Sequence, residues 1–154
     1  MNFLIDSVKN LKSFKELDSS IKISKNTAVF GSEEAVLSLF APAFNELGKK
    51  VCVISQNRVT ARKTYEDISS ISSEKCVLYP EKDVFFYDRD SKSKENTKKR
   101  LEAMAEVSSD KADIVVTTLN ALTAKISKRE IFSNYKINIK SGAQISLEDL
   151  RVKL

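Results

Sequence analysis

The sequence contains no histidine, and this absence excludes several common kinds of site. Histidine is the usual general base of hydrolases, so mechanisms that pair a serine or cysteine nucleophile with histidine are excluded. The only two cysteines, Cys52 and Cys76, cannot form a zinc site without histidine. Both lie within apolar runs, which predicts buried, reduced thiols. We therefore expect no catalytic residue and no metal ligand in this chain.

Glycine and proline are also scarce, with three and two residues, which leaves little room for flexible linkers. No apolar run approaches the ~20 residues that a membrane-spanning helix needs, and the first residues carry no signal-peptide cleavage pattern. The 154 residues, 42% apolar and 31% charged, suit one globular domain, or one domain and part of another. We expect a cytoplasmic protein with no membrane contact. Its net charge of +5 permits nucleic-acid binding but does not argue for it.

Short apolar runs alternate with helical patterns through most of the chain. The predicted strands are residues 27–30, 51–54, 76–79 and 112–118. The predicted helices are an N-terminal one that ends near Leu17, one that Gly48 ends, and those at 57–70, 91–107 and 119–126. This alternation predicts an α/β domain with a parallel sheet flanked by helices and right-handed crossovers.

The last thirty or so residues have a different pattern. Residues 135–139 alternate like an edge strand, Ser141 and Gly142 form a turn, and Ser146 is placed to cap a final helix. We interpret residues 125–154 as the truncated beginning of a second, small α+β domain, and residues 1–124 as the first domain.

Residues 26–39 have the strand, turn and helix of a nucleotide site. A P-loop carries G-x-x-x-x-G-K-[ST], whose backbone N–H groups and lysine hold phosphates while its hydroxyl holds Mg²⁺. With Gly31 aligned to an internal P-loop glycine, the defining positions are Ala28, Glu33, Glu34 and Ala35. Glu34 replaces the lysine and Ala35 has no hydroxyl. We interpret this segment as a degenerate, helicase-like P-loop that binds no nucleotide.

A simpler interpretation of the same residues stays open. In it, Gly31 only supplies the turn into the helix, and Ser32 is an ordinary N-cap. The carboxylates of Glu33 and Glu34 then favour the helix dipole. This interpretation also predicts no ATP site.

Polar residues follow the second predicted strand, at the carboxyl end of the sheet, where α/β proteins bind ligands. They are Asn57, Arg58 and Thr60. They could contact a phosphate backbone, although Asn57 also suits a helix N-cap.

A second basic group follows the aromatic residues 85–87. It includes Lys98, Lys99 and Arg100, which could follow the backbone of DNA or simply form the solvated start of a helix. The nearby Asp83, Asp88 and Asp90 match no ion-binding loop.

Four segments, taken in order, resemble the amino-terminal, UvrB-like module of the transcription-repair coupling factors, the Mfd family. They are AVFGSEEAVLSL, VCVISQNRVTARKTYEDI, YPEKDVFFYDRDS with the following KKRLEAM, and ADIVVTTLNALTAKI. The third is the most specific, since family members typically carry a Tyr-Pro, an aromatic-Tyr-acidic step and then a helix with Arg-Leu. Too few residues separate Tyr87 from the next helix for the DNA-clamping hairpin of UvrB. Glu34 also agrees with Mfd, whose first module does not hydrolyse ATP.

The resemblance implies that the full-length parent is an ATP-driven double-stranded DNA translocase. It displaces stalled RNA polymerase and recruits UvrA in nucleotide excision repair, and its ATP and Mg²⁺ are held by a downstream motor. The UvrA surface belongs to the second domain, which begins near Lys125, so this fragment alone should bind UvrA poorly or not at all.

The implied role of the fragment is a non-catalytic scaffold that supports the UvrA-recruiting domain and helps hold the parent closed. The alternatives are an active P-loop ATPase domain and a nucleic-acid-binding, helicase-like module.

Overall fold

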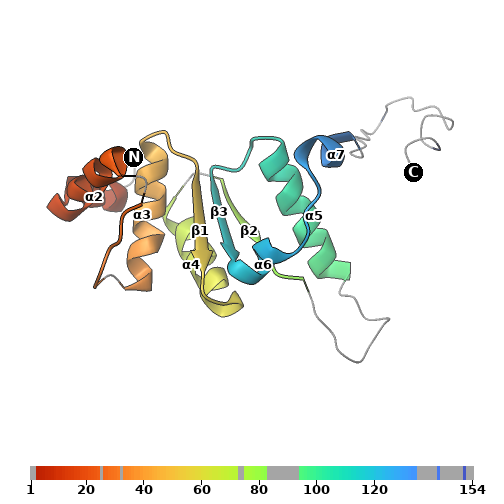
Figure 1. Cartoon of the computed structure of the whole chain (residues 1–154), viewed down its shortest axis with the longest axis horizontal. Coiled ribbons are helices and arrows are strands. Elements are labelled where there is room, and N and C mark those ends of the chain that lie inside the picture. Colours follow the sequence, from red (N-terminus) through yellow and green to blue (C-terminus); the bar gives the residue numbers. More distant parts are fainter. Residues whose placement is uncertain are drawn as a thin grey trace. The chain divides into compact units, whose positions relative to one another are not determined.

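The computed structural model describes residues 3–24, 26–31, 33–72, 75–82, 94–134, 142 and 151. The chain divides into two compact units, Met1–Ala124 and Lys125–Leu154. The first unit is a small parallel β-sheet with helices on both faces (Figure 1). The predicted α/β class is therefore confirmed for this unit.

The described elements of the first unit alternate as the sequence predicts. Its helices are α1 (Phe3–Asn10), α2 (Lys12–Ile23), α3 (Glu34–Glu46), α4 (Arg58–Ile71), α5 (Lys94–Ser108) and α6 (Leu119–Thr123). Its strands are β1 (Val51–Ser55), β2 (Cys76–Tyr79) and β3 (Ile114–Thr118). All three strands are parallel, in the order β1-β3-β2.

The prediction of a strand at residues 27–30, the first of the four, is wrong. This described segment has no regular secondary structure and pairs with no described strand. Val29 is 50% exposed and Phe30 is 91% exposed, so the apolar run is not part of the core. A core strand needs a neighbour for its backbone hydrogen bonds as well as apolar side chains, and a short run in the sequence shows only the second property.

The amino-terminal pattern forms two helices instead of the single one predicted. The chain breaks at Leu11, whose backbone is extended, and α2 then continues to Ile23. The buried side chains of this region include Phe14, whose ring centroid lies 5.3 Å from that of Phe40 and 4.7 Å from that of Phe44 in α3. The break therefore lets both short helices pack on α3.

Gly48 ends α3, as predicted. Its φ is +81°, its N–H donates to the Asn45 carbonyl at 2.8 Å, and the Lys49 N–H donates to the Phe44 carbonyl at 3.3 Å. Such a left-handed residue after a helix favours glycine. Pro42 lies inside α3, which continues past it.

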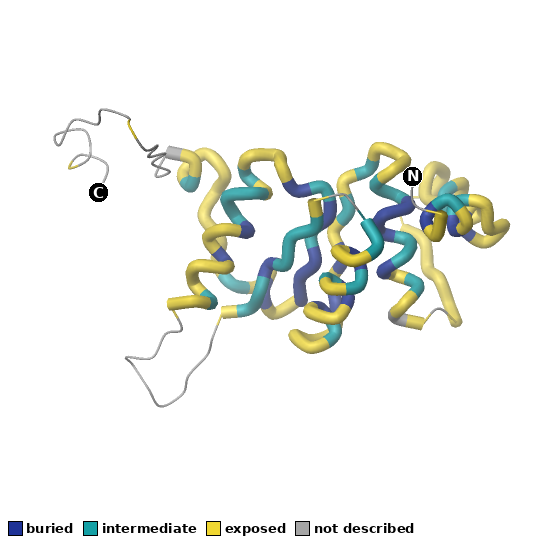
Figure 2. Tube along the Cα trace, turned by 180° about the vertical axis from the view of Figure 1, so that it is seen from behind, coloured by how far each residue is buried: buried dark blue, intermediate teal, exposed yellow. Residues whose placement is uncertain are grey.

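The helices α4 and α5 lie on opposite faces of the sheet. Successive strand residues point to opposite faces. Val116 packs in the cluster that includes Ile68 of α4, whereas Val115 packs in the cluster that includes Ala103 of α5. Figure 2 shows buried residues gathered on the strands and on the helix surfaces towards them.

The second unit contains helix α7 (Arg129–Asn134). The strand predicted at 135–139 and the aromatic residues 85–87 lie outside the described residues, as does the helix predicted from Ser146 except for Arg151, which is helical. None of the helices that the structure describes has the length and apolar character to span a membrane.

Candidate functional site

The segment predicted as a degenerate P-loop lies at the amino-terminal end of α3. Ala28 and Gly31 precede the helix, Glu33 is its N-cap residue, and Glu34 and Ala35 begin its first turn. Because α3 runs antiparallel to the following strand β1, this end of the helix lies at the carboxyl end of the sheet (Figure 1). The position would suit a nucleotide site, since α/β proteins bind ligands at this end.

The local geometry does not form a P-loop in the described residues. Gly31 has a φ of +75°, and a Cβ added to it would meet no atom within 4 Å, so glycine serves the turn and not a close approach. Glu33 is the N-cap residue of the helix and makes no side-chain cap hydrogen bond, and Ser32, the predicted N-cap, lies outside the described residues. No described strand leads into the turn. The degenerate P-loop interpretation is therefore not confirmed.

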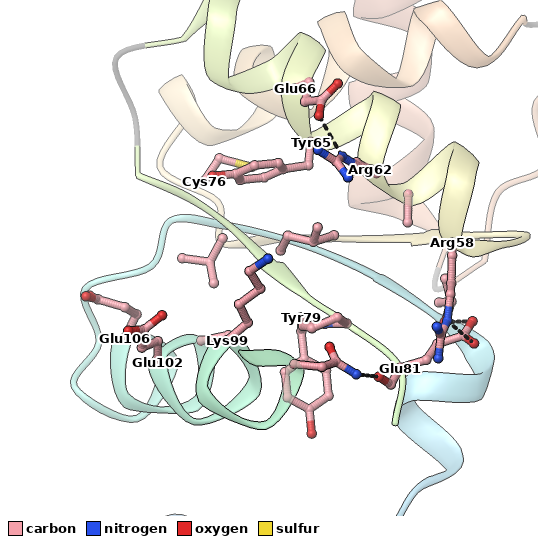
Figure 3. A pocket seen from close by; sticks show the side chains of 17 residues that line it. Arg58, Arg62, Tyr65, Glu66, Cys76, Tyr79, Glu81, Lys99, Glu102 and Glu106 are labelled. Atoms are coloured by element: carbon pink, nitrogen blue, oxygen red, sulfur yellow. Dashed lines mark hydrogen bonds and ion pairs between the residues drawn. The ribbon is translucent and has the colours of Figure 1, made fainter. Parts of the chain in front are cut away.

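A polar cluster centred on Glu81 lies at the carboxyl ends of the strands (Figure 3). The carboxylate accepts a hydrogen bond from Thr118 Oγ1 at 2.6 Å and lies 3.0 Å from Arg58 Nε. Arg58 also donates to the Lys82 carbonyl oxygen at 2.9 Å, and Asn96 Nδ2 donates to that of Glu81 at 2.8 Å. The cluster therefore joins the start of α4, the end of β3 and the first turn of α5.

The hydrogen bond from Thr118 and the ion pair with Arg58 lower the pKa of Glu81 below its ordinary value. Glu81 is therefore a carboxylate at neutral pH. Through this charge it connects Arg58 at the start of α4 with Thr118 at the end of β3. Burial raises the pKa of the Cys76 thiol to about 11, so that thiol stays protonated and is a poor nucleophile. Within the part of the chain that the structure describes, no three acidic or cysteine side chains lie close enough together to hold a metal ion.

The prediction that both thiols are buried is wrong for Cys52. This side chain is exposed, and Cys76 is half-buried. Cys52 lies on β1 and points to the same face of the sheet as α5. On that face α5 covers β2 and β3 but not β1. The apolar runs around both cysteines gave no sign that one face of β1 is uncovered.

The structure assigns different places to the six residues predicted as possible DNA contacts. Asn57 caps α4, as the alternative interpretation expected, by accepting a hydrogen bond from the Thr60 N–H at 2.9 Å. Arg58 belongs to the Glu81 cluster. All three residues lie at or beside the start of α4, and Arg58 lines the same groove between α4 and α5 as Lys99.

On α5, Lys98 and Lys99 are exposed and each pairs with a carboxylate four residues away. Arg100 is buried, with its guanidinium carbon 4.3 Å from the centroid of the Tyr79 ring and its N–H groups donating to the Tyr79 hydroxyl and the Pro80 carbonyl. Its charge is thus used to attach α5 to the end of β2. DNA binding by these six residues stays a prediction.

Sequence reasoning missed Glu81, Asn96 and Thr118. Glu81 follows β2 closely and Thr118 is the last residue of β3, and parallel strands end at the same edge of a sheet. Comparing the residues at predicted strand ends could therefore have found this pair. Asn96 gives no such signal, because its role depends on where α5 begins.

Comparison with known proteins finds similarity along the whole chain. No family model and no solved structure matches. A transcription-repair-coupling factor of Staphylococcus aureus (strain bovine RF122 / ET3-1) is 22% identical over 156 residues, which cover 100% of this chain. Another, of Staphylococcus haemolyticus (strain JCSC1435), is 24% identical over 151 residues, which cover 97%.

The similarity extends over only part of these relatives. The chain spans 13% of the length of each of the two. The resemblance that the sequence motifs predict is thereby confirmed: over nearly all of its length, this chain is similar to a stretch of the transcription-repair-coupling factors.

Proposed function

We propose that this chain is the amino-terminal, UvrB-like module of a transcription-repair coupling factor and acts as a non-catalytic scaffold that does not bind ATP. The observation that carries the proposal is the similarity of the whole chain to 13% of the length of such factors. The resemblance assigns translocation on DNA, displacement of RNA polymerase and recruitment of UvrA to the whole parent in the cytoplasm. It assigns ATP and Mg²⁺ to a motor elsewhere in that parent.

Two features of the nucleotide-site region support the absence of ATP binding. Glu34 stands where a P-loop has its phosphate-binding lysine, and Ala35 stands where a P-loop has its metal-binding hydroxyl residue. A carboxylate at the first position repels phosphate oxygens. The described residues 26–31 before α3 are exposed and form no strand, whereas a P-loop directly follows a strand.

Two features disfavour the DNA-binding alternative. The exposed Lys98 and Lys99 of α5 lie within i,i+4 ion pairs, and the guanidinium of Arg100 donates to Tyr79 and Pro80. A module that follows the phosphate backbone needs lysine and arginine charges that are available to phosphates. We therefore keep the scaffold as the proposed function.

Thermal unfolding and calorimetry with ATP and Mg²⁺ test the proposal on this chain. A ligand at about 100 times its Kd stabilises a folded protein by about 2.7 kcal/mol, a shift of several degrees in Tm for a domain of this size. We expect neither a Tm shift nor binding heat with millimolar ATP. A chain with Ala28→Gly, Glu33→Gly, Glu34→Lys and Ala35→Thr is the matched variant, since it restores the motif. Micromolar binding by the natural sequence would overturn the proposal.

A further inference from the structure

We draw no further inference here: the strongest candidate, the groove of about 540 Å³ between α4 and α5 at the edge of β2, is lined by charged side chains that already pair within the chain, and nothing in the described residues shows what covers it.

Discussion

The two faces of the sheet are made of similar apolar residues but are covered to different extents. On the face towards α3 and α4, Val53 and Val116 are buried in one core cluster. On the opposite face, α5 covers Val115, whereas the side chains of β1 lie open: Ile54 is 53% exposed and Cys52 is exposed. One strand therefore carries a core face and a solvent face, although its sequence, VCVIS, does not alternate between apolar and polar residues.

This difference shows that an apolar strand in a parallel sheet need not be covered on both faces. Both faces of such a sheet are normally covered, so continuous apolar runs are expected. In this chain α5 contacts β2 and leaves β1 without a covering helix on that side among the described residues. The stability of the unit should accordingly depend much more on one face than on the other.

The largest expected effect comes from two neighbouring valines of β3. Val116→Ala should lower the free energy of unfolding by about 2 kcal/mol, because it removes buried methyl groups and leaves a cavity. Val115→Ala removes the same atoms from the half-buried face and should cost about 1 kcal/mol or less. Urea denaturation of both variants measures the difference. Equal losses would mean that the two faces are packed equally well.

A smaller effect is expected at Glu81, where the start of α4, the end of β3 and the first turn of α5 meet. Its pKa is lower in the folded chain than the ordinary value of 4.5, so its contribution to stability is present above that value and is lost as the pH falls towards the folded pKa. Glu81→Gln should cost about 1 kcal/mol near pH 7, the scale of one charged hydrogen bond, and much less at low pH.

Urea denaturation at several pH values measures this effect. The control is Glu95→Gln: the hydrogen bond and charge of Lys99 lower the pKa of Glu95 too, but its side chain is 74% exposed, and its loss should cost little at any pH. If the difference in free energy of unfolding between wild type and Glu81→Gln stayed constant with pH, the charge of Glu81 would not stabilise the fold.

Much of the first unit could be predicted because its signals are local. Gly48 after an apolar helical face and Asn57 before one mark helix boundaries through their own backbone and side-chain chemistry. The strands at 51–54 and 76–79 are short apolar runs next to such boundaries. The false strand at 27–30 has the same local signal, but nothing local shows whether a run will find a pairing partner.

The candidate site was harder to predict because it depends on long-range packing. Arg100 is a helix residue in a basic stretch, and only the position of Tyr79 under α5 shows that its guanidinium is buried. Glu81 and Thr118 are separated by 37 positions in the sequence and meet only through the parallel order of β2 and β3. Charge and composition alone favoured the exposed lysines over this cluster.

The smallest expected effect is at Ile54, on the uncovered face of β1. Ile54→Thr keeps a β-branched side chain and removes apolar surface that already contacts water, so the free energy of unfolding should change by less than about 0.5 kcal/mol. Val53→Thr, one residue away on the core face, places a hydroxyl in a buried cluster and should cost about 1–3 kcal/mol. If urea denaturation found similar losses for the two variants, Ile54 would be covered in solution. Light scattering would then identify whether a second copy covers it, since only that form of burial depends on protein concentration.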